Sequence, residues 1–251
     1  MWIGLLTLLG CGSGSNPTPP PAAPPQAAAP RPDTPRARVD LSAGQAWGAV
    51  LWKDGAAYWK GGGAQLFGAA GALDGAASGE AGPCGRPVSA PPGAVLALPT
   101  GGTAQAPPRA PGNQASVLER AAWRLDELLP ARDVYAPALP DRDPSHQRGV
   151  TVGSLVKTRR EGAPPVLVAS GVRDCVAAVA LLSADAASAL AADEIPKQCT
   201  ALTVLPPGDY DGDGTREFAL TSPERVLLYR LDETQDTPAL VRLADWSCGP
   251  G

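Results

Sequence analysis

The residues best suited to chemistry lie in one short acidic segment, residues 208–220, which reads GDYDGDGTREFAL. Its carboxylates stand at positions 1, 3, 5 and 9 of the pattern D-x-D-x-D-G-x-x-E. Alternate residues of a tight loop can turn toward a common centre, so three aspartates spaced by two can surround one hard cation. Gly214 stands where the chain must bend sharply, and the Thr215 carbonyl would supply a further oxygen. Because all of these donors are oxygens and no histidine or cysteine is nearby, the segment favours calcium over zinc or copper.

Two kinds of calcium loop share this spacing, and the flanking residues distinguish them. An EF-hand requires a bidentate glutamate at position 12, an apolar residue at position 8 and a following helix. Here Leu220 occupies position 12 and Arg216 occupies position 8, and residues that favour strands resume directly after Glu217. The sequence therefore predicts a loop between two β-strands rather than an EF-hand.

The segment resembles the calcium loop of FG-GAP or VCBS-type repeats, the units of integrin-like β-propellers, in which a short strand follows D-x-D-x-D-G-x-x-[DE]. The resemblance covers about 25 residues, from 205 to 229. It implies that a propeller-like β-unit surrounds the loop. The metal ligands that it implies are the side chains of Asp209, Asp211, Asp213 and Glu217 and the backbone carbonyl of Thr215.

The alternative interpretation of the acidic segment is a solvated Asp/Gly turn that binds no metal. Four carboxylates held close together without a cation would repel one another, and a tight turn needs only one Asp-Gly pair. The sequence therefore favours a metal-binding loop with Ca²⁺ as the cofactor. We expect its role to be structural, because coordination saturated by protein oxygens leaves little room for a substrate.

Short strands must position this loop. Residues 150–251 contain a series of short apolar runs separated by turn signals, which predicts an antiparallel meander. The runs at 166–170 and 176–185 align with two others about fifty residues later, which suggests two repeat units. In the earlier unit the equivalent of the acidic loop, residues 156–165, carries mostly positive charges and cannot hold calcium. Residues 183–194 suit either a helix or a hairpin.

A hairpin is predicted at residues 47–60, where two apolar runs flank Asp54-Gly55. Its aromatic side chains can pack in a sheet or form a stacking platform for sugars. Residues 61–112 are rich in Gly, Ala and Pro, which predicts long irregular connections with one strand at 94–99. The register predicted for the hairpin pairs Val50 with Trp59, Leu51 with Tyr58 and Trp52 with Ala57.

One amphipathic helix is predicted to begin at Ser116, which has capping-box spacing to Glu119, and to end before Pro130. The fold class expected is mainly β: an antiparallel meander, either open or forming a partial or small β-propeller, with this single helix. The apolar face of the helix consists of Leu118, Ala121, Ala122, Leu125, Leu128 and Leu129.

The N-terminus resembles the signal segment of bacterial lipoproteins, because the apolar residues 1–10 end in the lipobox sequence LLGC at Cys11. The resemblance implies a signal peptide, lipidation of Cys11, attachment to a membrane and a place in the cell envelope, which is the outer membrane in a Gram-negative cell. The Pro- and Ala-rich residues 11–40 predict a disordered tether, and residues 41–251 a β-rich globular domain. The alternative interpretation of residues 1–10 is a buried N-terminal strand or a wrongly assigned start site of the chain.

Four further cysteines, an even number, can form two disulfide bonds in an exported protein, in three possible connectivities. Buried free thiols are the alternative. A zinc site is disfavoured because no C-x-x-C spacing occurs. The four residues are Cys84, Cys175, Cys199 and Cys248.

Charge and motifs narrow the classes of function. The net charge is −4 and the longest basic run is Arg159-Arg160, so nucleic acid is not an expected partner. We expect a lipid-anchored binding or interaction module, with an unknown protein or glycan as its partner. An accessory subunit of an envelope complex is a further interpretation, with the helix or the aromatic hairpin as the docking surface.

An enzyme is not expected. The alternative is an envelope-associated hydrolase that acts on glycans or another extracellular substrate, since 251 residues suffice for an enzyme. His146 is the only histidine, in a polar loop, and no nucleophile-elbow, zinc-protease or phosphate-loop motif occurs. The carboxylates that could serve a glycosidase are Asp133, Asp141, Asp143 and Glu127.

Overall fold

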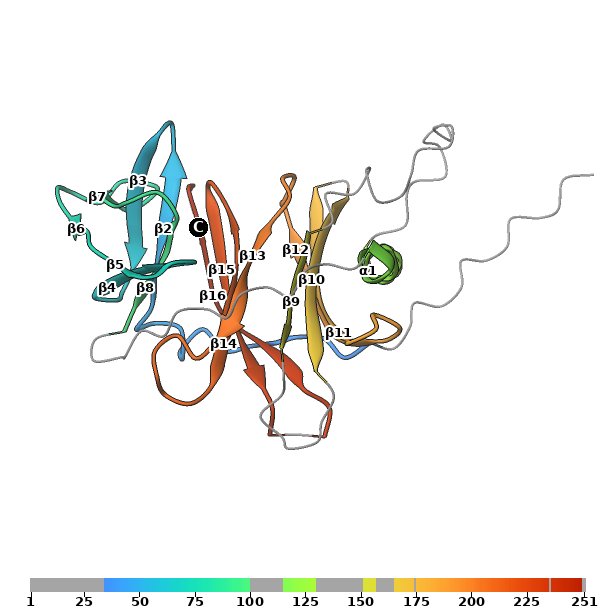
Figure 1. Ribbon diagram of the computed structural model, residues 1–251. Helices are drawn as coiled ribbons and strands as arrows, with labels where there is room; N and C mark the ends of the chain where they lie inside the picture. The colour runs from blue at the N-terminus through green and yellow to red at the C-terminus, as the bar shows by residue number, and fades with distance from the viewer. Residues whose placement is uncertain are drawn as a thin grey trace, which may run out of the picture. The chain divides into compact units, whose positions relative to one another are not determined.

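The computed structural model describes residues 34–99, 115–129, 151–156, 165–173, 175–234 and 236–249 (Figure 1). These residues form three β-sheets and one α-helix, so the protein is mainly β, as predicted. All sheet neighbours except one short N-terminal strand pair in the antiparallel sense.

Two four-strand meanders make up the C-terminal half. In each one the strands pair in chain order. The apolar runs at 166–170 and 176–185 form the second and third strands of the first meander, and the runs aligned with them form the second and third strands of the second meander. The two sets of strands therefore occupy equivalent positions. The first strands of the two meanders lie against each other, consistent with stacked, propeller-like units. The first meander contains β9 (Thr151–Val156), β10 (Val166–Arg173), β11 (Val176–Ser183) and β12 (Ala189–Pro196); the second contains β13 (Thr203–Gly208), β14 (Arg216–Ser222), β15 (Arg225–Asp232) and β16 (Ala239–Ser247).

Residues 183–194, which suited either a helix or a hairpin, form a hairpin: a turn follows β11, and the chain then continues as β12. Its alanines pair with β11, and both faces of β11 are buried. Ala177, Val179 and Leu181 face the second meander, whereas the alternate side chains of β11 face the helix. A strand buried on both faces has no polar alternation, so its sequence resembles that of a buried helix.

The curled sheet, formed by β2–β8, packs on the other face of the second meander (Figure 1). Its central hairpin has the predicted register, with Val50 opposite Trp59 and Trp52 opposite Ala57. The two turn residues take positive φ angles, 52° at Asp54 and 79° at Gly55, as a two-residue hairpin requires. The strands of the curled sheet are β2 (Gly48–Lys53), β3 (Ala56–Gly61), β4 (Gln65–Gly68), β5 (Gly71–Leu73), β6 (Ala76–Ala77), β7 (Arg86–Ser89) and β8 (Ala94–Leu98).

The prediction of long irregular connections after the hairpin was wrong for the described part of that region. The strand predicted at 94–99 is present as β8, but β4, β5, β6 and β7 were missed. These strands have two to four residues each and are joined by glycine-rich turns. Strands this short carry too few side chains for a periodic pattern, and pairing with β8 and β3 decides their conformation.

Helix α1 (Ala115–Leu128) covers the outer face of the first meander and begins one residue before the predicted start. Ala121, Leu125 and Leu129 are buried against β10 and β11, as the periodicity predicted. Arg173 at the end of β10 joins the helix to the sheet, since its guanidinium lies 2.6 Å from Asp126 Oδ1 and donates to the Asp126 carbonyl.

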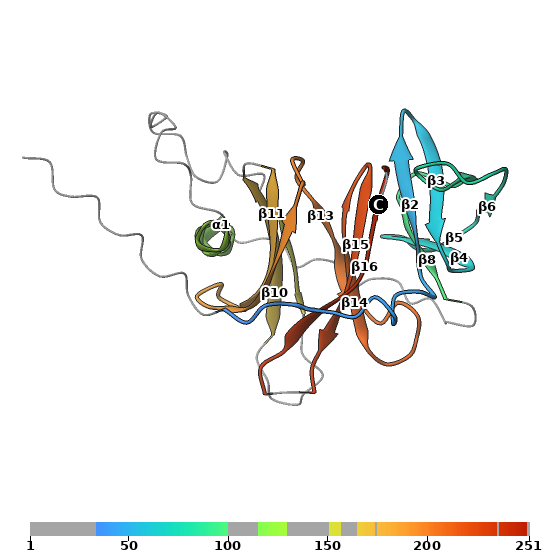
Figure 2. The same cartoon turned by 180° about the vertical axis from the view of Figure 1, so that it is seen from behind.

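The domain begins earlier than predicted. Residues 34–40, the last part of the predicted tether, run along the edges of both meanders (Figure 2, blue). Ala37 N–H donates to the Ala192 carbonyl of β12, and β1 (Arg38–Val39) then pairs in parallel with β16. Arg38 also pairs with Asp232. Composition alone missed this segment, because backbone groups and charged side chains make many of its contacts, although Ala37 also packs against the core.

Two disulfide bonds join distant parts of the chain. Cys84 in the curled sheet region bonds to Cys248 after β16, and Cys175 bonds to Cys199. The second bond fixes the β10–β11 turn to the connection between the meanders. The predicted disulfide count is thus confirmed, with the connectivity now assigned.

We expect Tyr229→Phe to lower the free energy of unfolding by about 2 kcal/mol. Tyr229 is fully buried on β15, and its hydroxyl donates to Asp193 Oδ2 on β12 over 2.9 Å. Arg242 Nε lies 3.4 Å from the same oxygen. The variant leaves a half-buried carboxylate with one partner fewer between the meanders. Urea denaturation measures the change, and Tyr58→Phe, at a half-exposed position, is the control that should change stability by less than about 0.5 kcal/mol. Equal losses in the two variants would contradict this role.

Candidate metal centre

The acidic loop connects β13 to β14 at the lower end of the second meander in Figure 1. Gly208 and Glu217 are paired across the two strands, so the loop starts and ends at one point of the sheet. Two glycines inside it take left-handed φ angles, 78° at Gly212 and 92° at Gly214. A strand follows the loop directly, which confirms the prediction that excluded an EF-hand.

Three of the predicted ligands converge. One carboxylate oxygen from each of Asp209, Asp211 and Glu217 lies within 4.8 Å of the other two, so these residues can hold a metal ion. Glu217 is 2% exposed, and the other two carboxylates are half-buried. The donor set contains only oxygen atoms, which suits a hard divalent cation.

Hydrogen bonds from the loop itself fix the converging carboxylates. Gly214 N–H donates to Asp209 Oδ2 over 3.1 Å, and Tyr210 N–H donates to Glu217 Oε2 over 3.2 Å. The Thr215 hydroxyl donates to Glu217 Oε1 over 2.8 Å. These hydrogen bonds therefore restrain the Asp209 and Glu217 carboxylates within the loop.

Asp213 is the predicted side-chain ligand that lies outside this group of three. Its Oδ1 accepts from the Thr215 N–H over 2.6 Å and lies 2.5 Å from the Thr215 hydroxyl. Short acidic side chains readily bond backbone N–H groups two residues ahead, and this local turn competes with metal ligation. Ligation by Asp213 and by the Thr215 carbonyl remains a prediction.

The converging charges oppose one another. Burial raises the pKa of the Glu217 carboxyl from its usual 4.5 to about 7, and Asp211 and Asp213 add to the increase. Burial also raises the pKa of Asp211, with further contributions from Asp213 and Asp209. A divalent cation at this position would favour the ionised forms and remove the repulsion.

Tyr210 anchors the loop to the hydrophobic core, a role that the sequence analysis did not assign. It is fully buried, its ring centroid lies 4.8 Å from that of Phe67, and its hydroxyl contacts the Pro206 carbonyl. The sequence signal that could have identified it is an aromatic residue between two aspartates of an otherwise polar loop. Tyr210 thus couples the loop to both the second meander and the curled sheet.

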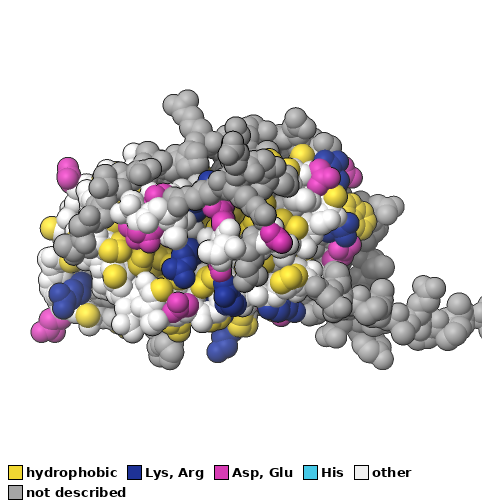
Figure 3. All heavy atoms as spheres, turned by 90° about the horizontal axis from the view of Figure 1, so that it is seen from below, with side chains coloured by type: hydrophobic (Ala, Val, Ile, Leu, Met, Phe, Trp, Pro, Cys, Tyr) yellow, Lys and Arg dark blue, Asp and Glu magenta, His cyan; other side chains and the backbone are white. Residues whose placement is uncertain are grey.

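The other predicted functional residues are mostly outside the described part of the chain, including Cys11, His146, Asp133, Asp141 and Asp143. Glu127 is described; it lies on α1, is partly exposed and pairs with Arg124. On the part of the surface that Figure 3 colours by type, Lys and Arg side chains lie among Asp and Glu side chains. None of the described helices combines the length and the apolar character that crossing a membrane requires.

Comparisons with protein-family models, with curated proteins and with solved structures found no match to this chain.

Proposed function

We propose that the protein is a lipid-anchored, exported binding module whose β-rich domain is stabilised by one structural calcium ion in the β13–β14 loop. The observation that carries the proposal is the convergence of Asp209, Asp211 and Glu217 in a loop with only oxygen donors. The FG-GAP-like spacing of the acidic residues, together with the strand that follows the loop directly, supports calcium as the ion.

A structural role suits the position of the loop better than a catalytic one. Glu217 belongs to β14, whereas Asp209 directly follows β13, so an ion that binds both closes the end of the strand pair. Tyr210 lies between these two residues and enters the core. Calcium would therefore restrain the loop and, through Tyr210, the contact between the second meander and the curled sheet.

Export is supported by the two disulfide bonds, which persist in oxidising compartments. The lipobox sequence at Cys11 and the Pro- and Ala-rich residues after it supply the proposed lipid anchor and spacer. A domain held at a membrane by such a spacer is suited to contacts with proteins or glycans of the envelope.

Native mass spectrometry of the protein extracted from membranes tests the lipid anchor, the disulfide bonds and the calcium site together. We expect one Ca²⁺ for each chain, two intact disulfide bonds and an acyl-modified Cys11 as the first residue. A Cys11→Ser variant should move to the soluble fraction and keep its calcium, because the anchor and the metal loop are independent. An unmodified Cys11 in the membrane-extracted protein would overturn the anchor, and a mass without calcium would overturn the metal site.

A further inference from the structure

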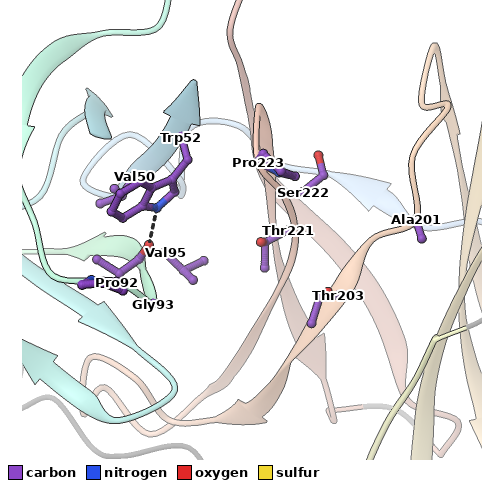
Figure 4. A pocket seen from close by; sticks show the side chains of 11 residues that line it. Val50, Trp52, Pro92, Gly93, Val95, Ala201, Thr203, Thr221, Ser222 and Pro223 are labelled. Carbon is purple, nitrogen blue, oxygen red and sulfur yellow. Dashed lines mark hydrogen bonds between the residues drawn. The ribbon is translucent and has the colours of Figure 1, made fainter. Parts of the chain in front are cut away.

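A hollow of about 400 Å³ opens where the curled sheet and the second meander separate at one edge of their shared core (Figure 4). One wall comes from the curled sheet and carries Trp52, Pro92 and Val95. The other wall comes from the second meander and its β14–β15 turn, and carries Thr203, Thr221 and Ser222. The volume lies within the range of small-molecule sites in proteins, about 300–1,000 Å³.

The two walls are held in a fixed relation. Trp52 N–H donates to the Pro223 carbonyl over 2.6 Å, which joins the end of β2 to the β14–β15 turn. The Trp52 indole Nε1 donates to the Ala94 carbonyl over 3.2 Å, which fixes the plane of the ring. Aromatic side chains that are fixed before binding lose little conformational entropy when a ligand packs against them.

The second wall offers hydroxyl groups and no charge. Thr203 and Thr221 are directly opposite each other on β13 and β14, and Ser222 follows at the end of β14. Among the described residues, none of these three hydroxyls makes a hydrogen bond with another side chain or with the backbone. None of the described residues that line the hollow is charged. Its ligand should therefore be neutral, apolar on one side and rich in hydrogen-bonding groups on the other.

We infer that this hollow is a binding site for a neutral saccharide of one or two pyranose rings. The apolar face of a pyranose ring can pack on Trp52, while ring hydroxyls can exchange hydrogen bonds with Thr203 and Thr221. This inference rests on the proposed function as a binding module and names the class of its ligand.

A proline-rich peptide is the other ligand that packs on tryptophan, and the chemistry of the hollow suits it less well. Grooves for such peptides present several aromatic side chains, whereas Trp52 is the one aromatic residue among the described residues that line the hollow. The peptide carbonyls only accept hydrogen bonds. Sugar hydroxyls both donate and accept, as do the threonine and serine hydroxyls.

The test is isothermal titration of the whole protein with neutral disaccharides of glucose and of N-acetylglucosamine, and with a proline-rich peptide. We expect at least one disaccharide to bind with a dissociation constant of about 0.1–1 mM, and the peptide not to compete. The double variant Thr203→Val and Thr221→Val, which keeps the side-chain shape, should weaken binding at least about tenfold, or about 1.4 kcal/mol.

Two further variants separate this site from the rest of the molecule. Trp52→Ala should abolish saccharide binding, whereas Trp123→Ala, at a tryptophan that is 54% exposed on α1, should leave it unchanged. The valine double variant should lose saccharide binding but keep the stabilisation by calcium. Failure of the saccharide inference therefore leaves the calcium effect intact, and failure of the calcium proposal leaves saccharide binding intact. Absence of saccharide binding up to about 10 mM, equal binding by the valine double variant, or displacement by the peptide would overturn the inference.

Discussion

Replacing Cys84 and Cys248 together with serine is expected to lower the free energy of unfolding by about 5 kcal/mol. The bond closes a segment of 164 residues, and a cross-link over a long segment removes much entropy from the unfolded chain. It also holds Cys84, in the curled sheet region, to the chain that follows β16. Guanidinium denaturation of the purified double variant measures the loss.

The second disulfide bond provides the matched control for the first. The Cys175–Cys199 bond spans 24 residues, so its removal is expected to cost about 3 kcal/mol. Both of its cysteines are exposed, whereas Cys84 is buried, so a dithiol reductant should open Cys175–Cys199 first. A larger loss from the shorter cross-link, or reduction in the opposite order, would contradict this assignment.

Glu217→Gln is expected to change stability in opposite directions with and without calcium. In chelator at pH 8, the variant should be more stable than the natural protein by up to about 3 kcal/mol, because glutamine cannot ionise in the buried loop. In calcium, the variant should be the less stable of the two, since it lacks one anionic ligand. Thermal unfolding followed by circular dichroism in both conditions measures the two differences.

The same carboxyl predicts how the stability of the metal-free protein depends on pH. The pKa of Glu217 is about 7 in the folded chain against 4.5 for an ordinary glutamate. The folded state therefore binds its proton more tightly, and this contribution to stability is complete below pH 4.5 and is lost as the pH rises through 7. In chelator the unfolding free energy of the natural protein should fall in this window, while that of Glu217→Gln should fall much less. Parallel pH profiles of the unfolding free energy for the natural protein and for Glu217→Gln would contradict the burial of an ionising carboxyl at this position.

The sequence predicted those parts of the fold in which local signals and tertiary contacts agree. The Asp54-Gly55 turn sets the register of its hairpin, and the spacing of Leu125 and Leu129 sets the buried face of α1. The other strands of both meanders were also identified from their apolar runs, except β12, whose alanine-rich sequence suited either a helix or a hairpin. Long-range pairing decided the rest: the short strands β4–β7, the backbone contacts of residues 34–40 and the disulfide connectivity have no local signature.

The candidate metal site was predicted in outline and corrected in detail. Acidic residues at alternate positions identified the loop, since spacing by two directs side chains to one centre. The structure then separates Asp213, which bonds the backbone of its own turn, from the three converging carboxylates. The saccharide hollow could not be predicted, because its walls come from strands more than a hundred residues apart in the chain.

Calorimetric titration of the chelator-treated protein with Ca²⁺ is the most direct test of the central claim that the β13–β14 loop holds one structural calcium ion. We expect one ion for each chain and, at about a hundredfold to a thousandfold excess over the dissociation constant, about 3–4 kcal/mol of added stability. Asp211→Asn should lose most of this binding, whereas Asp74→Asn, an exposed aspartate in the curled sheet region, should keep it. No binding heat and an unchanged melting temperature, or equal binding by Asp211→Asn, would contradict the claim.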